Sequence, residues 1–180
     1  MIEPIIKAVP MIPVYYYHFP AMSGININLC KMLKMGRDER KMKSLVGAKF
    51  TSLDFQELSN CVNEGFHILC GYNHFLLNTL NFGGHGGISR DANYAGSLQK
   101  KIFKNFEKQN YQKALFYQNK NLELYEIENS LKGGMSMYKY LMSRLRGINM
   151  GGSRNPIRNL TLEEKQLIDA SIERIKELIY

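Results

Sequence analysis

Three short apolar runs and a glycine-rich fourth segment, separated by segments with helical periodicity, constrain the fold of this 180-residue chain more than any other feature of its sequence. Apolar runs of this length between turn residues predict buried β-strands. We predict strands at residues 11–17, 46–50, 66–70 and 86–89. Because strands that alternate with helices form parallel sheets, the pattern predicts an α/β fold with four parallel strands.

The predicted helices lie between the strands and fill the rest of the chain: residues 3–9, 25–35, 55–64 and 75–80, then 94–108, 111–131, 136–145 and 161–179. Thr51-Ser52-Leu53-Asp54 and the Thr161–Glu164 pair have the pattern of a capping box. Four strands cannot close a barrel, whose usual form has eight strands and roughly 250 residues. We therefore predict the C-terminal half of a (β/α)8 TIM barrel at residues 1–108. We expect residues 109–180 to be a helical extension packed on it, the whole being one N-terminally truncated domain.

Lys49 lies inside the second apolar run, between Ala48 and Phe50. Lysine is rarely buried without a partner, so one interpretation is an edge position from which the amine reaches water. The other interpretation is an amine nucleophile, because desolvation leaves more free amine to attack a carbonyl and form a Schiff base. Tyr17 ends the first predicted strand as Lys49 ends the second, and reactive groups of parallel barrels lie at such strand ends. Tyr17 is then a candidate proton relay. The alternative is a core aromatic residue, as we expect for Tyr15 and Tyr16.

The formal net charge of +8 allows nucleic acid, an anionic membrane surface or an acidic small molecule as partner. The densest basic stretch, Lys100 to Lys108, has helical spacing and indicates a solvated helix face rather than a nucleic-acid site. We expect no membrane span and no signal peptide, because no apolar run is long enough and the first residues lack a basic segment.

Three cysteines without CxxC spacing indicate a reducing compartment, and we expect a cytoplasmic protein. The four histidines show no paired ligand spacing, so we expect no metal site.

Several motifs of this sequence resemble those of one enzyme family. The segment Tyr15-Tyr16-Tyr17-His18-Phe19-Pro20, continuing through Gly24, resembles the tyrosine motif of the N-acetylneuraminate lyases, especially the animal type. Gly47-Ala48-Lys49-Phe50-Thr51 resembles their Schiff-base lysine strand. Gly71-Tyr72, the glycine-rich residues 83–89 and the segment 147–156 resemble later parts of the same family. The wider group is the pyruvate-dependent class I aldolases, which include dihydrodipicolinate synthase, and the resemblance covers the second half of their barrel.

The resemblance implies a Schiff-base lyase that cleaves sialic acid to N-acetylmannosamine and pyruvate, without cofactor or metal, in a cytoplasmic homotetramer. It implies that Lys49 forms the imine, that Tyr17 relays a proton and that Thr51 hydrogen-bonds the substrate near the imine. The backbone of Gly71 and of Ser89 would contact the polyhydroxy tail. Small molecules, and neither nucleic acid nor membrane, are then the expected partners.

Three departures from the family pattern keep alternatives open. Asn73 and His74 occupy the places of an acidic pair that holds sugar hydroxyls, and both can still form hydrogen bonds. Ser89-Arg90-Asp91 stands in place of a Gly-Ser-Thr sequence, and the run Ile88-Ser89-x-x-Ala92-Asn93 resembles the dihydrodipicolinate synthase branch. The family's carboxylate-binding Gly-Ser/Thr-Thr-Gly-Glu loop has no counterpart here. The alternatives are a related pyruvate aldolase with another substrate, a non-catalytic partner of a longer relative, and a fragment of a gene model.

Overall fold

The structure, a computed structural model, describes residues 3–180 and has two compact units, Met1–Ile88 and Ser89–Tyr180. The division falls earlier than the boundary that we expected after residue 108. The reason is helix α6 (Ala92–Glu107), which contacts α7 (Tyr111–Ser130), α8 (Gly134–Arg146) and α9 (Leu162–Ile179). Packing of the later helices on the barrel stays a prediction.

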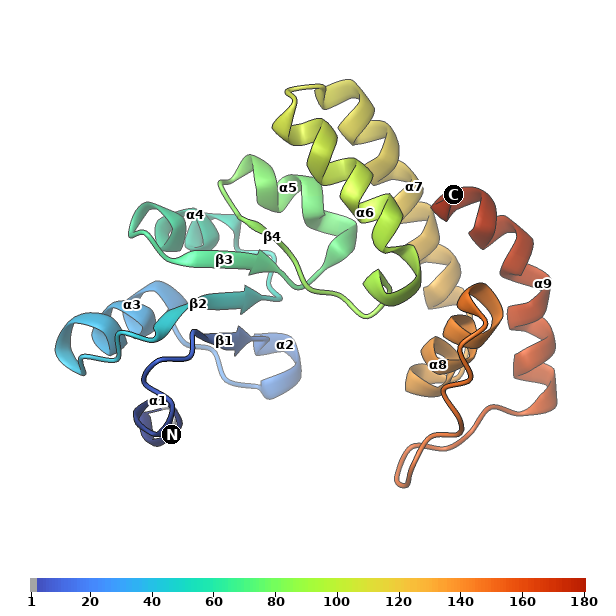
Figure 1. Cartoon of the computed structure of the whole chain (residues 1–180), viewed down its shortest axis with the longest axis horizontal. Helices are drawn as coiled ribbons and strands as arrows, with labels where there is room; N and C mark the ends of the chain where they lie inside the picture. Colours follow the sequence, from blue (N-terminus) through green and yellow to red (C-terminus); the bar gives the residue numbers. More distant parts are fainter. Residues whose placement is uncertain (1–2) are drawn as a thin grey trace. The chain divides into compact units, whose positions relative to one another are not determined.

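The first unit is built on a four-stranded parallel sheet in the order β1-β2-β3-β4 (Figure 1). Its strands are β1 (Val14–His18), β2 (Leu45–Phe50), β3 (His67–Cys70) and the very short β4 (Gly86–Gly87). All three pairings are parallel, as predicted. The first strand starts three residues later than expected, because residues 9–12 form turns ahead of Pro13.

The other elements of this unit are α1 (Glu3–Ala8), α2 (Pro20–Ser23), α3 (Leu29–Lys34), the π-helix η1 (Met35–Glu39), α4 (Phe55–Asn63), the 3-10 helix η2 (Asn73–Phe75) and α5 (Leu76–Asn81). Pro20 begins α2, in keeping with the preference of proline for the first helical turn. The capping box predicted at Thr51 is wrong. Asp54 caps α4 instead, because its carboxylate accepts the Glu57 backbone N–H at 2.9 Å.

The two faces of this sheet differ in burial. One face packs against α3 and α4 in a core of buried side chains: Ile6, Leu29, Leu33, Met42, Leu45, Ala48, Phe50, Leu58, Cys61, Phe66 and Ile68. Because successive residues of a strand point to opposite faces, Tyr15, Tyr17 and Lys49 lie on the other face. There Tyr15 and Tyr17 are exposed by 38% and 50%. The expectation that Tyr15 is a core residue is therefore wrong, whereas Tyr16 packs against the core.

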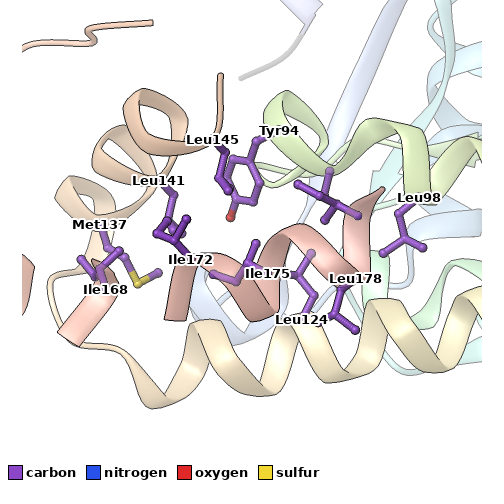
Figure 2. Packing of buried hydrophobic residues seen from close by; sticks show 12 residues of the cluster. Tyr94, Leu98, Leu124, Met137, Leu141, Leu145, Ile168, Ile172, Ile175 and Leu178 are labelled. Atoms are coloured by element: carbon purple, nitrogen blue, oxygen red, sulfur yellow. The ribbon is translucent and has the colours of Figure 1, made fainter. Parts of the chain in front are cut away.

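The second unit is a bundle of α6, α7, α8 and α9 around its own apolar core (Figure 2). Figure 2 shows Leu98, Leu124, Leu141 and Ile175 packed between these helices. Helix α9 buries Ile168, Ile172, Ile175 and Ile179, which recur at helical spacing. The capping box of Thr161 and Glu164 is confirmed, with both reciprocal bonds present. Within residues 3–180, every helix is too short or too polar to span a membrane.

Candidate active site

Lys49 and Tyr17 are direct cross-strand neighbours on the open face of the sheet. The register pairs Tyr17 of β1 with Lys49 of β2, and the Lys49 Nζ atom lies 4.1 Å from the centroid of the Tyr17 ring. Each is the last residue but one of its strand, which matches the predicted bounds 46–50 for Lys49 but places Tyr17 one residue inside the strand end. A cation over an aromatic face is attracted by the ring quadrupole, and this contact holds the amine at the carboxyl end of the strands. Sequence reasoning thus placed these two side chains together, which their assigned roles require.

Thr51 and Gly71 form a tightly packed pair just beyond the ends of β2 and β3. The Gly71 backbone N–H donates to the Phe50 carbonyl at 2.7 Å, and a Cβ atom at Gly71 would lie 1.8 Å from Thr51 Oγ1. The Thr51 side chain is buried, and its hydroxyl has no hydrogen-bond partner within residues 3–180. The structure therefore encloses the hydroxyl that was predicted to meet the substrate.

The predicted Asn73 and His74 lie in η2, next to a run of aromatic rings that the sequence interpretation missed. The Phe19 ring stacks on Tyr17 at a centroid distance of 5.7 Å and meets the Tyr72 ring edge-on at 5.9 Å. The Tyr72 ring in turn lies 5.2 Å from the His74 ring. Burial lowers the pKa of His74 to about 4, so this imidazole is neutral at pH 7. Asn73 and His74 are therefore both neutral at pH 7, and His74 lies beside aromatic rings.

A second row of polar side chains lies one step back along the strands on the same face. Tyr15 shares a hydrogen bond of 2.9 Å with His67 Nδ1, and the His67 and His85 rings are 4.2 Å apart. Burial, followed by the neighbouring His85, lowers the pKa of His67. The signal in the sequence was His67, a histidine in an otherwise apolar strand. Its position in the strand directs its side chain to the same face of the sheet as Lys49.

Ser89 belongs to the second unit, where it is part of a hydrogen-bonded chain. The Gln99 Nε2 group donates to Ser89 Oγ at 3.0 Å and to Asp91 Oδ2 at 2.9 Å. Asp91 is 4% exposed, and its burial raises its pKa. The local contacts of Ser89 are therefore fixed by α6. Its predicted contact with substrate stays a prediction.

No cluster of three or more His, Cys, Asp or Glu side chains that could hold a metal ion occurs in the described part of the chain. On the face of the sheet that carries Lys49, the described side chains offer an amine, phenols and an imidazole. Among these, the amine is the group that can form an imine with a carbonyl carbon.

Comparison with known proteins identifies the family. The family model described as "Dihydrodipicolinate synthetase family" matches residues 2–175. This chain belongs to that family. The resemblance stated from the motifs is thereby confirmed at the level of the dihydrodipicolinate synthetase family.

Relatives of this dihydrodipicolinate synthetase family member include two animal proteins. N-acetylneuraminate lyase A of Xenopus laevis is 32% identical over 158 residues, which cover 87% of this chain and 51% of the relative. N-acetylneuraminate lyase of Mus musculus is 30% identical over 172 residues, covering 93% of this chain and 53% of the relative. The chain therefore spans about half the length of the curated relatives it matches.

A solved structure gives the same result for the fold. The N-acetylneuraminate lyase of Proteus mirabilis superposes with a TM-score of 0.81 at 25% identity, over 97% of this chain and 61% of that one. The α/β prediction of a partial barrel with added helices is confirmed for this member of the dihydrodipicolinate synthetase family.

Proposed function

We propose that this chain carries the Schiff-base half of an aldolase-type lyase active site, which acts on sialic acid to give N-acetylmannosamine and pyruvate. The observation that carries the proposal is the pairing of the Lys49 amine with the Tyr17 ring on the open face of the sheet. Family membership and the similarity to N-acetylneuraminate lyases support it.

In this proposal the Lys49 amine attacks the keto carbon of the open-chain substrate, and water leaves as the imine forms. The protonated imine then accepts the electron pair of the breaking carbon–carbon bond. Tyr17 relays the proton of the substrate hydroxyl, which becomes the aldehyde oxygen of N-acetylmannosamine. Protonation of the resulting enamine and hydrolysis of the imine release pyruvate and restore the amine.

The remaining assignments are the contacts that hold the substrate. Thr51 would have to rotate its enclosed hydroxyl toward the imine. The backbone of Gly71 and of Ser89, with the side chains of Asn73 and His74, would contact the polyhydroxy tail.

A second candidate is a related pyruvate aldolase with a less hydroxylated aldehyde. It is favoured by Asn73 and the neutral His74, which occupy the places of the family's acidic pair, and by the neighbouring rings of Phe19 and Tyr72. Aromatic rings bind apolar or planar groups better than they bind hydroxyl groups.

Reductive trapping with pyruvate tests the imine. We expect borohydride treatment of the chain with pyruvate to add one reduced pyruvyl group, located on Lys49 by peptide mass spectrometry. Lys49→Arg should abolish the adduct, while Lys43→Arg, a change at an exposed lysine of the same unit, should leave it unchanged. Tyr17→Phe should keep the adduct, because the ring under the amine remains.

Two results would contradict the proposal. One is a chain that is folded by circular dichroism but unlabelled. The other is a label spread evenly over many lysines, since this would reflect general amine reactivity. A labelled Lys49 without cleavage of sialic acid would favour the second candidate, which a panel of aldehydes with pyruvate would then test.

A further inference from the structure

In the second unit, residues 147–160 form a long loop between α8 and α9 that borders a cavity of about 600 Å³. One wall is a polar face of α8, from which Ser136, Lys139 and Ser143 point to the cavity at helical spacing. Lys165 of α9 lines it from another side. The proposed lyase function makes no use of this cavity.

The hydroxyl groups at the cavity are already committed to holding the loop. Ser136 Oγ is 2.6 Å from both Ser153 Oγ and the Arg158 carbonyl oxygen. Because the carbonyl can only accept, the single Ser136 proton goes to it, and Ser153 must then donate to Ser136. These two protons tie the loop to α8 and are not available to a ligand.

Two asparagines of the loop are oriented by backbone donors. The Gly151 N–H donates to Asn149 Oδ1 at 2.9 Å, and the Ser153 N–H donates to Asn159 Oδ1 at 2.7 Å. A backbone N–H requires the amide oxygen, so both side chains are fixed in one orientation. Both residues line the cavity, and their NH₂ groups remain as donors.

Lys139 and Lys165 add positive charge to the cavity. Among the described residues, no carboxylate lies within ion-pair distance of either amine. The nearby acids have other partners: Glu164 is held by Arg158, and Asp169 by Arg144 and the Tyr140 hydroxyl. Lys139 donates one bond to the Gly152 carbonyl and keeps two protons. The Lys165 amine lies 6.0 Å from the centroid of the Tyr140 ring.

The spare donors at this cavity therefore include two cationic amines and two amide groups, while the amide oxygens of Asn149 and Asn159 are used by the loop itself. We propose that the cavity binds a small dianionic oxyanion of the phosphate class, with Lys139, Lys165, Asn149 and Asn159 as its donors. A phosphate group presents several acceptor oxygens and no obligatory donor, which complements this set. Free phosphate and a phosphate monoester share this chemistry.

Calorimetric titration of the full chain tests the proposal, with inorganic phosphate and glycerol phosphate as separate probes. The buffer is matched with chloride at equal ionic strength, because salt screens non-specific attraction. We expect saturable one-to-one binding with a Kd on the order of 1 mM or below for at least one probe. Phosphate alone would indicate a free-ion site, and tighter binding of the ester a metabolite site.

Three variants make the test specific. Lys165→Gln and Asn149→Asp should each weaken binding about tenfold or more, the value of one charge-assisted hydrogen bond. Asn149→Asp keeps the acceptor for Gly151 but replaces the donor with a negative charge, so a purely structural role would leave the fold and the titration unchanged. Lys176→Gln removes a charge elsewhere on α9, where Lys176 pairs with Glu173, and should have no effect.

The proposal is wrong if wild-type chain that is folded by circular dichroism shows no saturable binding of either probe. It is also wrong if Lys176→Gln weakens binding as much as Lys165→Gln, because the effect would then be general charge. Neither result depends on imine formation at Lys49, so this inference and the proposed function fail separately.

Discussion

Individual residues decide how closely the strands of the first unit can approach. Gly47 of β2 is paired with His67 of β3, and a Cβ atom at Gly47 would lie 1.8 Å from the His67 carbonyl oxygen. No side-chain movement relieves this contact, because the neighbouring atom belongs to the backbone. The position of Lys49, two residues later on the same strand, depends on this approach.

Gly47→Ala should therefore be strongly destabilising. We expect the free energy of unfolding to fall by about 3 kcal/mol or more, because an added methyl group must separate the two strands. Gly96→Ala is the matched control, since no atom lies within 4 Å of a Cβ at this position in α6. It should raise stability by up to about 1 kcal/mol through the helix preference of alanine. Urea unfolding followed by circular dichroism measures both, and an unchanged midpoint for Gly47→Ala would contradict the observed register.

At the scale of elements, α6 and α7 are joined by a buried acid. The Tyr94 hydroxyl on α6 donates to Glu128 Oε1 on α7 at 2.5 Å, and Glu128 is 5% exposed. Burial, followed by the charge of Asp91, raises the pKa of Glu128 to about 7. Arg90 and Tyr138, the latter on α8, also face this group. The acid is therefore protonated in the folded chain at a pH where it would be ionised in the unfolded chain.

Stability should consequently fall as the pH rises through neutrality. A folded pKa above the unfolded value means that the folded state binds more protons between these values, so the stabilisation is complete below about pH 4.5 and lost above about pH 7. We expect a loss on the order of 3 kcal/mol between pH 5 and pH 8. Glu128→Gln should flatten this dependence in urea unfolding across the same range. An equally steep dependence in the variant would assign the effect to other groups.

The elements themselves were largely predictable, and their ends were not. Strand and helix order followed from periodicity, and the positions of Tyr17 and Lys49 at the ends of two predicted strands brought them together. The cap at Asp54 was missed because Thr51 fits the same local pattern. Only the packing of Thr51 against Gly71 shows that its side chain is buried there. The aromatic run of Phe19, Tyr72 and His74 was also missed, because these rings are adjacent only in space.

At the scale of the whole molecule, the sheet of the first unit has an unpaired edge at β1. In the described residues, β1 has β2 as its sole strand neighbour, and Met11 and Ile12 just before it are 90% and 58% exposed. An unpaired strand next to exposed apolar side chains favours association with another chain. The expected homotetramer stays a prediction, as does the cytoplasmic location.

A charge next to β1 should reduce association of the chain. We expect concentration-dependent association of the wild type in sedimentation velocity experiments. Ile12→Lys should weaken it, since edge lysines oppose strand pairing. Leu167→Lys adds the same charge at a side chain with 57% exposure in the other unit and is the matched control. Equal behaviour of the two variants would show that net charge, rather than the β1 edge, controls association.

The contact between Thr51 and Gly71 couples two positions that are twenty residues apart. Any side chain at position 71 would occupy the space of the threonine hydroxyl and come within 3.0 Å of the Phe50 carbonyl. A homologue with a methyl group at position 71 must therefore replace Thr51 with a smaller residue and move the Phe50 carbonyl group. In laboratory evolution, a side chain at position 71 should therefore appear only in variants that have already changed position 51.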